Sequence, residues 1–151
     1  MPQTSLLPTT VIGSYSFPKW LEEARRLGTQ GLLSPEAVDE AHDNAVKSAI
    51  KDQEMAGVDI ITDGELRRET MVYFFSKRIH GFDFEHAKMH PIGNLDPNIQ
   101  MPDPVIVEKV KWKQSLNMDK HFKFLKEHTV AVPKVCVTGP QMLAKRATNE
   151  F

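Results

Sequence analysis

The chain contains a single cysteine, Cys136, and this scarcity excludes an internal disulfide framework and a zinc site built from several cysteines. A chain without disulfides is typical of a reducing compartment. The sequence also lacks an apolar run of the roughly 18 residues that a membrane span requires, and its first residues lack the basic and apolar regions of a signal peptide. These absences predict a soluble, cytoplasmic protein.

An excess of charge of one sign is missing as well. The chain has 19 Lys and Arg residues against 20 Asp and Glu residues, which gives a formal net charge of -1. This balance gives no support for a nucleic acid or an anionic membrane as the partner. We therefore expect a small neutral or zwitterionic ligand.

The first part of the chain alternates between strand and helix patterns. Residues 9–13 and 58–62 are predicted to form short buried strands, because both runs are rich in β-branched residues. Helices are predicted over 18–27 and 35–56, since a proline opens each one and a glycine follows each one. A strand, a helical crossover and a second strand predict a right-handed parallel unit.

The remainder of the chain predicts the same alternation with one interruption. We expect helices over 66–79 and 118–128, a third buried strand over 134–139, and a helix from Pro140 to the end of the chain. Between 82 and 113 the periodic pattern fails or alternates only briefly. That stretch predicts an irregular or β-hairpin insertion.

Three units of strand followed by helix are typical of the opening of a (β/α)8 barrel. A closed barrel requires around 250 residues, and the chain has 151. The predicted fold class is therefore α/β, the N-terminal portion of a (β/α)8 TIM-type barrel with the insertion over 82–113. We expect residues 1–151 to form a single partial barrel domain that leaves apolar faces uncovered.

A cluster of charged residues follows the strand predicted over 58–62. Asp63 and Glu65 flank Gly64, which allows the backbone to turn sharply. Ligands bind at the carboxyl ends of parallel strands in α/β domains, so these acids are candidates for holding an amine-bearing or zwitterionic substrate. The same residues are equally typical of a solvated turn at the start of a helix with no ligand. The pattern alone leaves both interpretations open.

Four segments together resemble the catalytic domain of cobalamin-independent methionine synthase and its short relatives. They are 7–14 (Leu-Pro-Thr-Thr-Val-Ile-Gly-Ser), 53–65 (Gln-Glu-Met-Ala-Gly-Val-Asp-Ile-Ile-Thr-Asp-Gly-Glu), 68–82 (paired aromatics before His-Gly-Phe) and 137–140 (Val-Thr-Gly-Pro). The match covers the first half of that family's barrel. The resemblance implies a zinc-dependent methyltransferase that transfers a methyl group to the thiol of homocysteine to form methionine.

The resemblance also implies which residues bind the substrate. The backbone around Ile12, Gly13 and Ser14 would hold the carboxylate of the amino acid, and Glu65 would pair with its ammonium group. Backbone N–H groups and a hydroxyl suit a carboxylate. A carboxylate within hydrogen-bond reach of an ammonium adds a charge-assisted contact of roughly 1.5 to 3 kcal/mol.

Supporting roles are implied for two further residues. Asp63 stands where relatives carry either an acid or a histidine. Arg68 matches a recurrent arginine of the family and would orient Glu65, and a surface or interface arginine is the alternative interpretation. Cys136 lies inside the strand predicted over 134–139, which favours a small buried apolar residue over a ligand.

The chain departs from the family in two respects. The family's zinc ligands, a His, Cys, Glu and Cys set, lie in the half of the barrel that this sequence does not contain. We therefore expect zinc in the complete enzyme and assign no metal ligand here, because His86 and His90 have no cysteine near them in the sequence. Folate-using members carry a Ser-Arg-Cys stretch where residues 97–105 read Pro-Asn-Ile-Gln-Met-Pro-Asp-Pro-Val. This departure favours a methylated corrinoid protein over a folate as the methyl donor, or a different thiol such as coenzyme M as the acceptor, and the donor stays open between a folate and a methylated corrinoid protein.

Two other interpretations remain open. A related zinc alkyltransferase would act on coenzyme M or another thiol, and Glu65 would then not need to meet an ammonium. Alternatively, the chain would be a non-catalytic half-barrel that self-associates as a homo-oligomer or pairs with a complementing C-terminal half. In that case the partner would cover the exposed strand edges.

Overall fold

The computed structural model describes residues 6–91 and 98–151. Residues 92–97, part of the predicted insertion, lie outside the described residues, as do residues 1–5. The chain divides into two compact units, the first of Met1–Arg67 and Asn117–Cys136, the second of Arg68–Leu116 and Val137–Phe151. The single domain expected over 1–151 stays a prediction.

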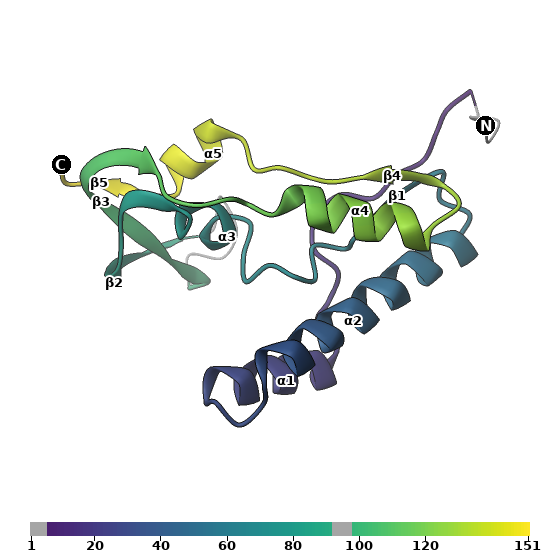
Figure 1. The fold of residues 1–151 in the computed structure, drawn as a ribbon. Helices are drawn as coiled ribbons and strands as arrows, with labels where there is room; N and C mark the ends of the chain where they lie inside the picture. Colours follow the sequence, from purple (N-terminus) through teal and green to yellow (C-terminus); the bar gives the residue numbers. More distant parts are fainter. Residues whose placement is uncertain (1–5, 92–97) are drawn as a thin grey trace. The chain divides into compact units, whose positions relative to one another are not determined.

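The first unit combines helices with a small parallel sheet (Figure 1). Helices α1 (Lys19–Thr29) and α2 (Pro35–Met55) lie side by side, and strands β1 (Ile60–Thr62) and β4 (Val132–Lys134) pair in parallel. Helix α4 (Met118–His128) packs against both α2 and β4. The core takes side chains from every helix and from β1, each 2% exposed or less: Leu21, Val46, Ile50, Ile61 and Leu125.

The predicted helix starts are largely correct. Ser34 caps α2, because its hydroxyl accepts a hydrogen bond from the backbone N–H of Ala37 at 3.3 Å. Gly28 was expected to follow α1 but lies inside it. A side chain at Gly28 would collide with the neighbouring helix, since its Cβ would lie 2.5 Å from Cγ2 of Val38.

The strand predicted over 9–13 is reduced to one parallel bridge, between Thr10 and Ile60. The backbone N–H of Ile60 donates to the carbonyl of Thr9 at 3.0 Å, and regular pairing goes no further. The segment is also not buried as predicted, because Ile12 is 86% exposed.

The side chain of Gln53 explains why this pairing stops. In the observed register, the next rung would join the backbone N–H and carbonyl of Thr62 to Val11 and Gly13. Gln53 on α2 occupies both groups instead: its Oε1 accepts from the N–H at 2.9 Å, and its Nε2 donates to the carbonyl at 2.9 Å. The carbonyl of Val11 accepts from Nζ of Lys134 at 2.7 Å. Residues 11–14 therefore leave the sheet.

The second unit is built on an antiparallel pair of long strands, β2 (Ile79–Pro91) and β3 (Gln100–Trp112). Strand β5 (Thr148–Asn149) joins β3 in parallel, and the short helices α3 (Tyr73–Ser76) and α5 (Pro140–Lys145) complete the unit. The described part of the insertion predicted over 82–113 thus consists mostly of paired strands, with shifts of register near Gly81 and between Asp83 and Lys88.

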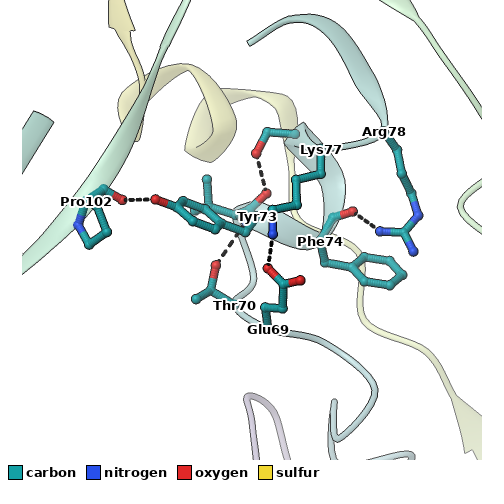
Figure 2. A network of polar contacts seen from close by, with 9 residues as sticks. Glu69, Thr70, Tyr73, Phe74, Lys77, Arg78 and Pro102 are labelled. Atoms are coloured by element: carbon teal, nitrogen blue, oxygen red, sulfur yellow. Dashed lines mark hydrogen bonds and ion pairs between the residues drawn. The ribbon is translucent and has the colours of Figure 1, made fainter. Parts of the chain in front are cut away.

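The helix predicted over 66–79 is wrong, because only α3 is helical in that stretch. The hydroxyl of Thr70 accepts from the backbone N–H of Tyr73 at 2.9 Å, and the Tyr73 hydroxyl donates to the carbonyl of Pro102 on β3 at 3.0 Å. The chain then enters β2 at Ile79, so tertiary pairing overrides the helical pattern of these β-branched and aromatic residues. Figure 2 shows this network, which also includes the pairs Lys77 with Glu69 and Arg78 with the carbonyl of Phe74.

The third strand lies earlier than predicted, at Val132–Lys134 and not over 134–139. Lys134 therefore stands at the carboxyl end of a strand and not at its start. Cys136 follows the strand and is half-buried. The helix from Pro140 begins where predicted but ends at Lys145, before β5.

The parallel pairing around β1 agrees with the predicted α/β class, but the strands of the described ranges do not close a barrel. None of the helices described here is both long enough and apolar enough to cross a membrane.

Candidate functional site

The turn after β1 carries the two acids that the sequence singled out. Gly64 has φ +62° and Glu65 has φ +55°, so two successive residues adopt the left-handed backbone conformation. For a residue with a side chain this conformation costs about 1–2 kcal/mol. Asp63 holds the turn, because its Oδ1 accepts a hydrogen bond from the backbone N–H of Glu65 at 3.0 Å. Strained backbone of this kind is found preferentially at functional sites.

Tyr15 packs against the same turn. Its backbone N–H donates to the carbonyl of Gly64 at 2.9 Å. A Cβ atom on Gly64 would lie 3.3 Å from the Tyr15 ring and 3.2 Å from Cβ of Ala49, so the turn fits closely between them. Burial, followed by the nearby charge of Asp52, raises the pKa of the Tyr15 hydroxyl. The Tyr15 side chain that packs against the turn is therefore uncharged at neutral pH.

Ser14 and Glu65 meet at this position although 51 residues separate them. The Ser14 hydroxyl donates to Oε2 of Glu65 at 3.2 Å. Glu65 is only 6% exposed, whereas Ser14 is exposed. The structure therefore brings together the serine and the acid proposed from the sequence, at the carboxyl end of β1. Their role in substrate binding stays a prediction.

The other predicted substrate residues precede Ser14 in the released segment. Ile12 and Gly13 are exposed, and Gly13 has φ +87°, a conformation that favours glycine. Among the described residues other than Gly13 and its two neighbours in the chain, no heavy atom lies within 4 Å of the position that a Gly13 Cβ would take, so the backbone has open space here.

The two supporting residues lie in different units. Asp63 is 2% exposed, and among the described residues its Oδ2 has no hydrogen-bond partner. Arg68 belongs to the second unit, where it is 2% exposed and its guanidinium carbon lies 5.3 Å from the ring centre of Phe74. The proposed action of Arg68 on Glu65 stays a prediction.

Sequence reasoning missed three residues that shape this site: Gln53, Tyr15 and Lys134. Lys134 is placed to matter by the register of the sheet, in which it pairs with Thr62. Its Nζ donates to Oγ1 of Thr10 at 2.5 Å and to the carbonyl of Val11 at 2.7 Å. A basic residue that ends an apolar strand was the available signal, but the strand was predicted to start at that residue.

The second unit contains a cavity of about 630 Å³. Its polar wall is the buried carboxylate of Asp103, which lies 2.7 Å from Nη2 of Arg146 and 3.3 Å from Nδ1 of His90. Three methionines supply apolar walls: Met71, Met101 and Met142. Two lining residues, Met101 and Asp103, come from the stretch in which the chain differs from folate-using members.

The described part of the chain contains no group of three or more His, Cys, Asp and Glu side chains that could hold a metal ion. His86 lies 2.6 Å from Asp83, and this hydrogen bond raises the pKa of His86 and lowers that of Asp83. His90 faces Asp103, as described above. These residues therefore do not fit the zinc that the resemblance implies for the complete enzyme.

Comparison with curated proteins gives long matches. A methionine synthase of Sulfurisphaera tokodaii is 41% identical over 152 residues, which cover 100% of this chain and 43% of the relative. A methionine synthase of Saccharolobus solfataricus is 40% identical over 152 residues, with 100% of this chain and 44% of the relative covered. The chain thus spans less than half the length of these relatives.

A solved structure is similar to this chain in both fold and sequence. It is a B12-independent methionine synthase from Shewanella sp. W3-18-1 in complex with selenomethionine, 25% identical, with a TM-score of 0.77 over 97% of this chain and 42% of that one. The family model described as the catalytic domain of cobalamin-independent synthase matches residues 7–149. The chain therefore belongs to the cobalamin-independent methionine synthase family, within its catalytic domain.

Proposed function

We propose that this chain supplies the part of a homocysteine S-methyltransferase that binds the amino-acid moiety of the substrate. In the proposed reaction, the homocysteine thiol first gives up its proton to solvent, and the thiolate sulfur then forms a bond to the methyl carbon as the bond between that carbon and the donor breaks. The electron pair of the broken bond stays with the donor, a methylated folate or a methylated corrinoid protein. This chain's contribution is to bind and orient homocysteine.

The observation that carries the proposal is the Ser14–Glu65 contact at the carboxyl end of β1. In parallel α/β folds this edge is where ligands bind. An exposed serine hydroxyl beside a buried carboxylate offers groups of the kind that an amino acid needs. The proposal is also supported by the relative from Shewanella, whose structure contains selenomethionine.

Burial explains why Glu65 would favour a cation. A carboxylate that is 6% exposed has lost most of its water, so a positively charged hydrogen-bond donor that reaches it interacts more strongly than it would in solvent. The ammonium of an amino acid would supply both a positive charge and several N–H donors. A contact of this kind contributes about 1.5–3 kcal/mol.

The backbone of 12–14 would meet the other end of the substrate. These residues have left the sheet, so their N–H groups are not committed to the pairing that stops at Thr10. N–H groups of a bent segment are suitable donors to a carboxylate. A free amino acid would therefore be held at both ends, with its side chain left to the reacting partner.

Titration calorimetry of the chain with L-methionine, L-homocysteine and 2-mercaptoethanesulfonate tests the proposal. We expect both amino acids to bind and the sulfonate, which has no ammonium, not to bind. Glu65→Gln should weaken amino-acid binding about tenfold or more, since it removes the charge of the contact. Glu40→Gln is the matched control, because it makes the same change at an exposed position of α2.

Two results would count against the proposal. Unchanged affinity for both amino acids in a folded Glu65→Gln variant would remove Glu65 from the site. Preference for 2-mercaptoethanesulfonate over homocysteine would favour an alkyltransferase that acts on a different thiol.

A further inference from the structure

We propose that Lys134 is a positioning residue that gives the amino-acid site its selectivity for a carboxylate. This inference rests on the proposed function, since it concerns the second charged end of the same substrate. Lys134 lies at the carboxyl end of β4, where the register sets it beside Thr62 and therefore next to the start of the Asp63–Glu65 turn. It stands at the edge that would bind the ligand.

The contacts of Lys134 reach the segment that carries the carboxylate-binding backbone. Ile60 of β1 pairs with Val132 of β4 and also bridges Thr10, so β1 lies between the two segments. The ammonium of Lys134 spans this distance and donates to Oγ1 of Thr10 and to the carbonyl of Val11. Val11 directly precedes the residues proposed to hold the substrate carboxylate.

This contact has two consequences for residues 12–14. Because Gln53 occupies the groups of Thr62 that Val11 and Gly13 would otherwise pair with, the hydrogen bond from Lys134 replaces the missing rung at Val11. The bent segment is therefore anchored at Val11, immediately before the residues whose N–H groups are proposed to bind the carboxylate. The same ammonium also brings a positive charge to the part of the site that is proposed to bind the substrate carboxylate, whereas Glu65 is proposed to bind the ammonium group.

Charge therefore divides along the site. The acids Asp63 and Glu65 follow β1, and a lysine ends β4. An amino acid carries its ammonium and carboxylate groups on the same carbon, and these two groups match such a pair of opposite charges. A ligand with only an ammonium would use Glu65 and gain nothing from Lys134.

A pair of ligands separates the two ends. L-methionine carries both charges, and 3-(methylthio)propan-1-amine has the same thioether chain and ammonium without the carboxylate. For Lys134→Met we expect about a tenfold loss of affinity for L-methionine, because the variant removes both the anchor at Val11 and the nearby positive charge, and about no change for the amine. Glu65→Gln should weaken both ligands. Lys126→Met, at an exposed position of α4, is the matched control and should weaken neither.

Further variants keep the test decisive. Lys134→Arg preserves the charge and should restore the preference for L-methionine. If circular dichroism shows that Lys134→Met does not fold, Lys134→Gln replaces it, because it keeps a donor toward Val11 and removes the charge. The same selective loss is then expected.

Three outcomes would overturn the inference. A folded Lys134 variant with unchanged affinity for L-methionine would exclude a role in binding. An equal loss for both ligands would show a merely structural residue. A wild-type chain that binds the amine as well as L-methionine would show that the carboxylate is not recognised, while the ammonium site would stand. If the wild-type chain binds neither ligand, the proposed function itself fails.

Discussion

Replacing Gln53 by leucine tests the arrangement that releases residues 11–14 from the sheet. Gln53 is 1% exposed, and its amide donates to the carbonyls of Ala49 and Thr62, both at 2.9 Å, and accepts from the N–H of Thr62 at 2.9 Å. Leucine has a similar size but can make none of these hydrogen bonds. The N–H and carbonyl of Thr62 would then be buried without these partners.

The expected loss of stability follows from those two groups. A buried backbone group without a partner costs about 1–3 kcal/mol, so the two groups together cost about 4 kcal/mol, and burial of the leucine side chain returns about 2 kcal/mol. We therefore expect the free energy of unfolding of the first unit to fall by about 2 kcal/mol. With a urea dependence of about 2 kcal/mol per molar, the midpoint should fall by about 1 M.

The assay can follow the first unit alone. Trp20 lies in the first unit and Trp112 in the second, so a Trp112→Phe background leaves Trp20 as the reporter of urea unfolding. Gln114→Leu, at an exposed position, is the matched control. Gln53→Glu adds a second check, because at neutral pH its carboxylate would face two carbonyl oxygens. It should be destabilised more at pH 7 than at pH 4, relative to wild type at each pH. A midpoint of Gln53→Leu equal to that of the Gln114→Leu control would refute the reasoning.

Further predictions concern the turn after β1 and two histidines. Gly64→Ala should lower the free energy of unfolding by about 1–2 kcal/mol, because φ is +62° and the new Cβ would crowd Ala49 and Tyr15. Gly139→Ala, which has open space and no positive φ, should be nearly neutral in the same thermal unfolding experiment. Burial lowers the pKa of His42. The positive charges of Arg25 and Arg67 lower this pKa further, whereas the negative charge of Asp39 raises it. The folded state therefore binds fewer protons than the unfolded state, and stability should fall as pH drops through about 6.5 and below; His42→Asn should flatten this dependence, measured by urea unfolding between pH 7.5 and 5.5. NMR titration should place the pKa of His86 above that of His42, and Asp83→Asn should lower the His86 value; a His86 pKa at or below that of His42 would contradict the structure.

Residues near β1 show how far local pattern predicts this fold. The helix over Pro35–Met55 and the strand that follows it were predictable, because apolar spacing, a capping serine and Gly57 all agree. The helix at Met118–His128 was predictable from its apolar spacing alone, and its Leu125 is buried. In these elements the local preference and the tertiary packing point in the same direction.

The errors arise where a distant group competes with the local pattern. Residues 9–13 have the composition of a buried strand, but Gln53 and Lys134 take the hydrogen bonds that would continue it. Residues 66–79 have helical spacing, but only Tyr73–Ser76 is helical, and the chain enters the strand pairing of β2 at Ile79. No local period encodes such competition, because the competing groups are 40 or more residues away in the first case.

The residues of the candidate site were likewise predictable only in part. Ser14 and Glu65 were found from a resemblance of motifs, and the structure places them in contact. Lys134 was missed because a shift of two residues in β4 moved it from the start of a strand to its end. The ends of short strands are therefore the positions at which an error of boundary changes a prediction of function most.

The side chain of Gln53 also has a consequence for association between copies of the chain. An open strand edge is normally a template on which a foreign strand can add by backbone hydrogen bonds. At Thr62 that template is already filled by a glutamine from the protein's own helix. A strand from another molecule would have to displace a buried amide before it could pair there. The glutamine therefore protects this strand edge from aggregation by strand addition, a role that a charged side chain often has at other edges.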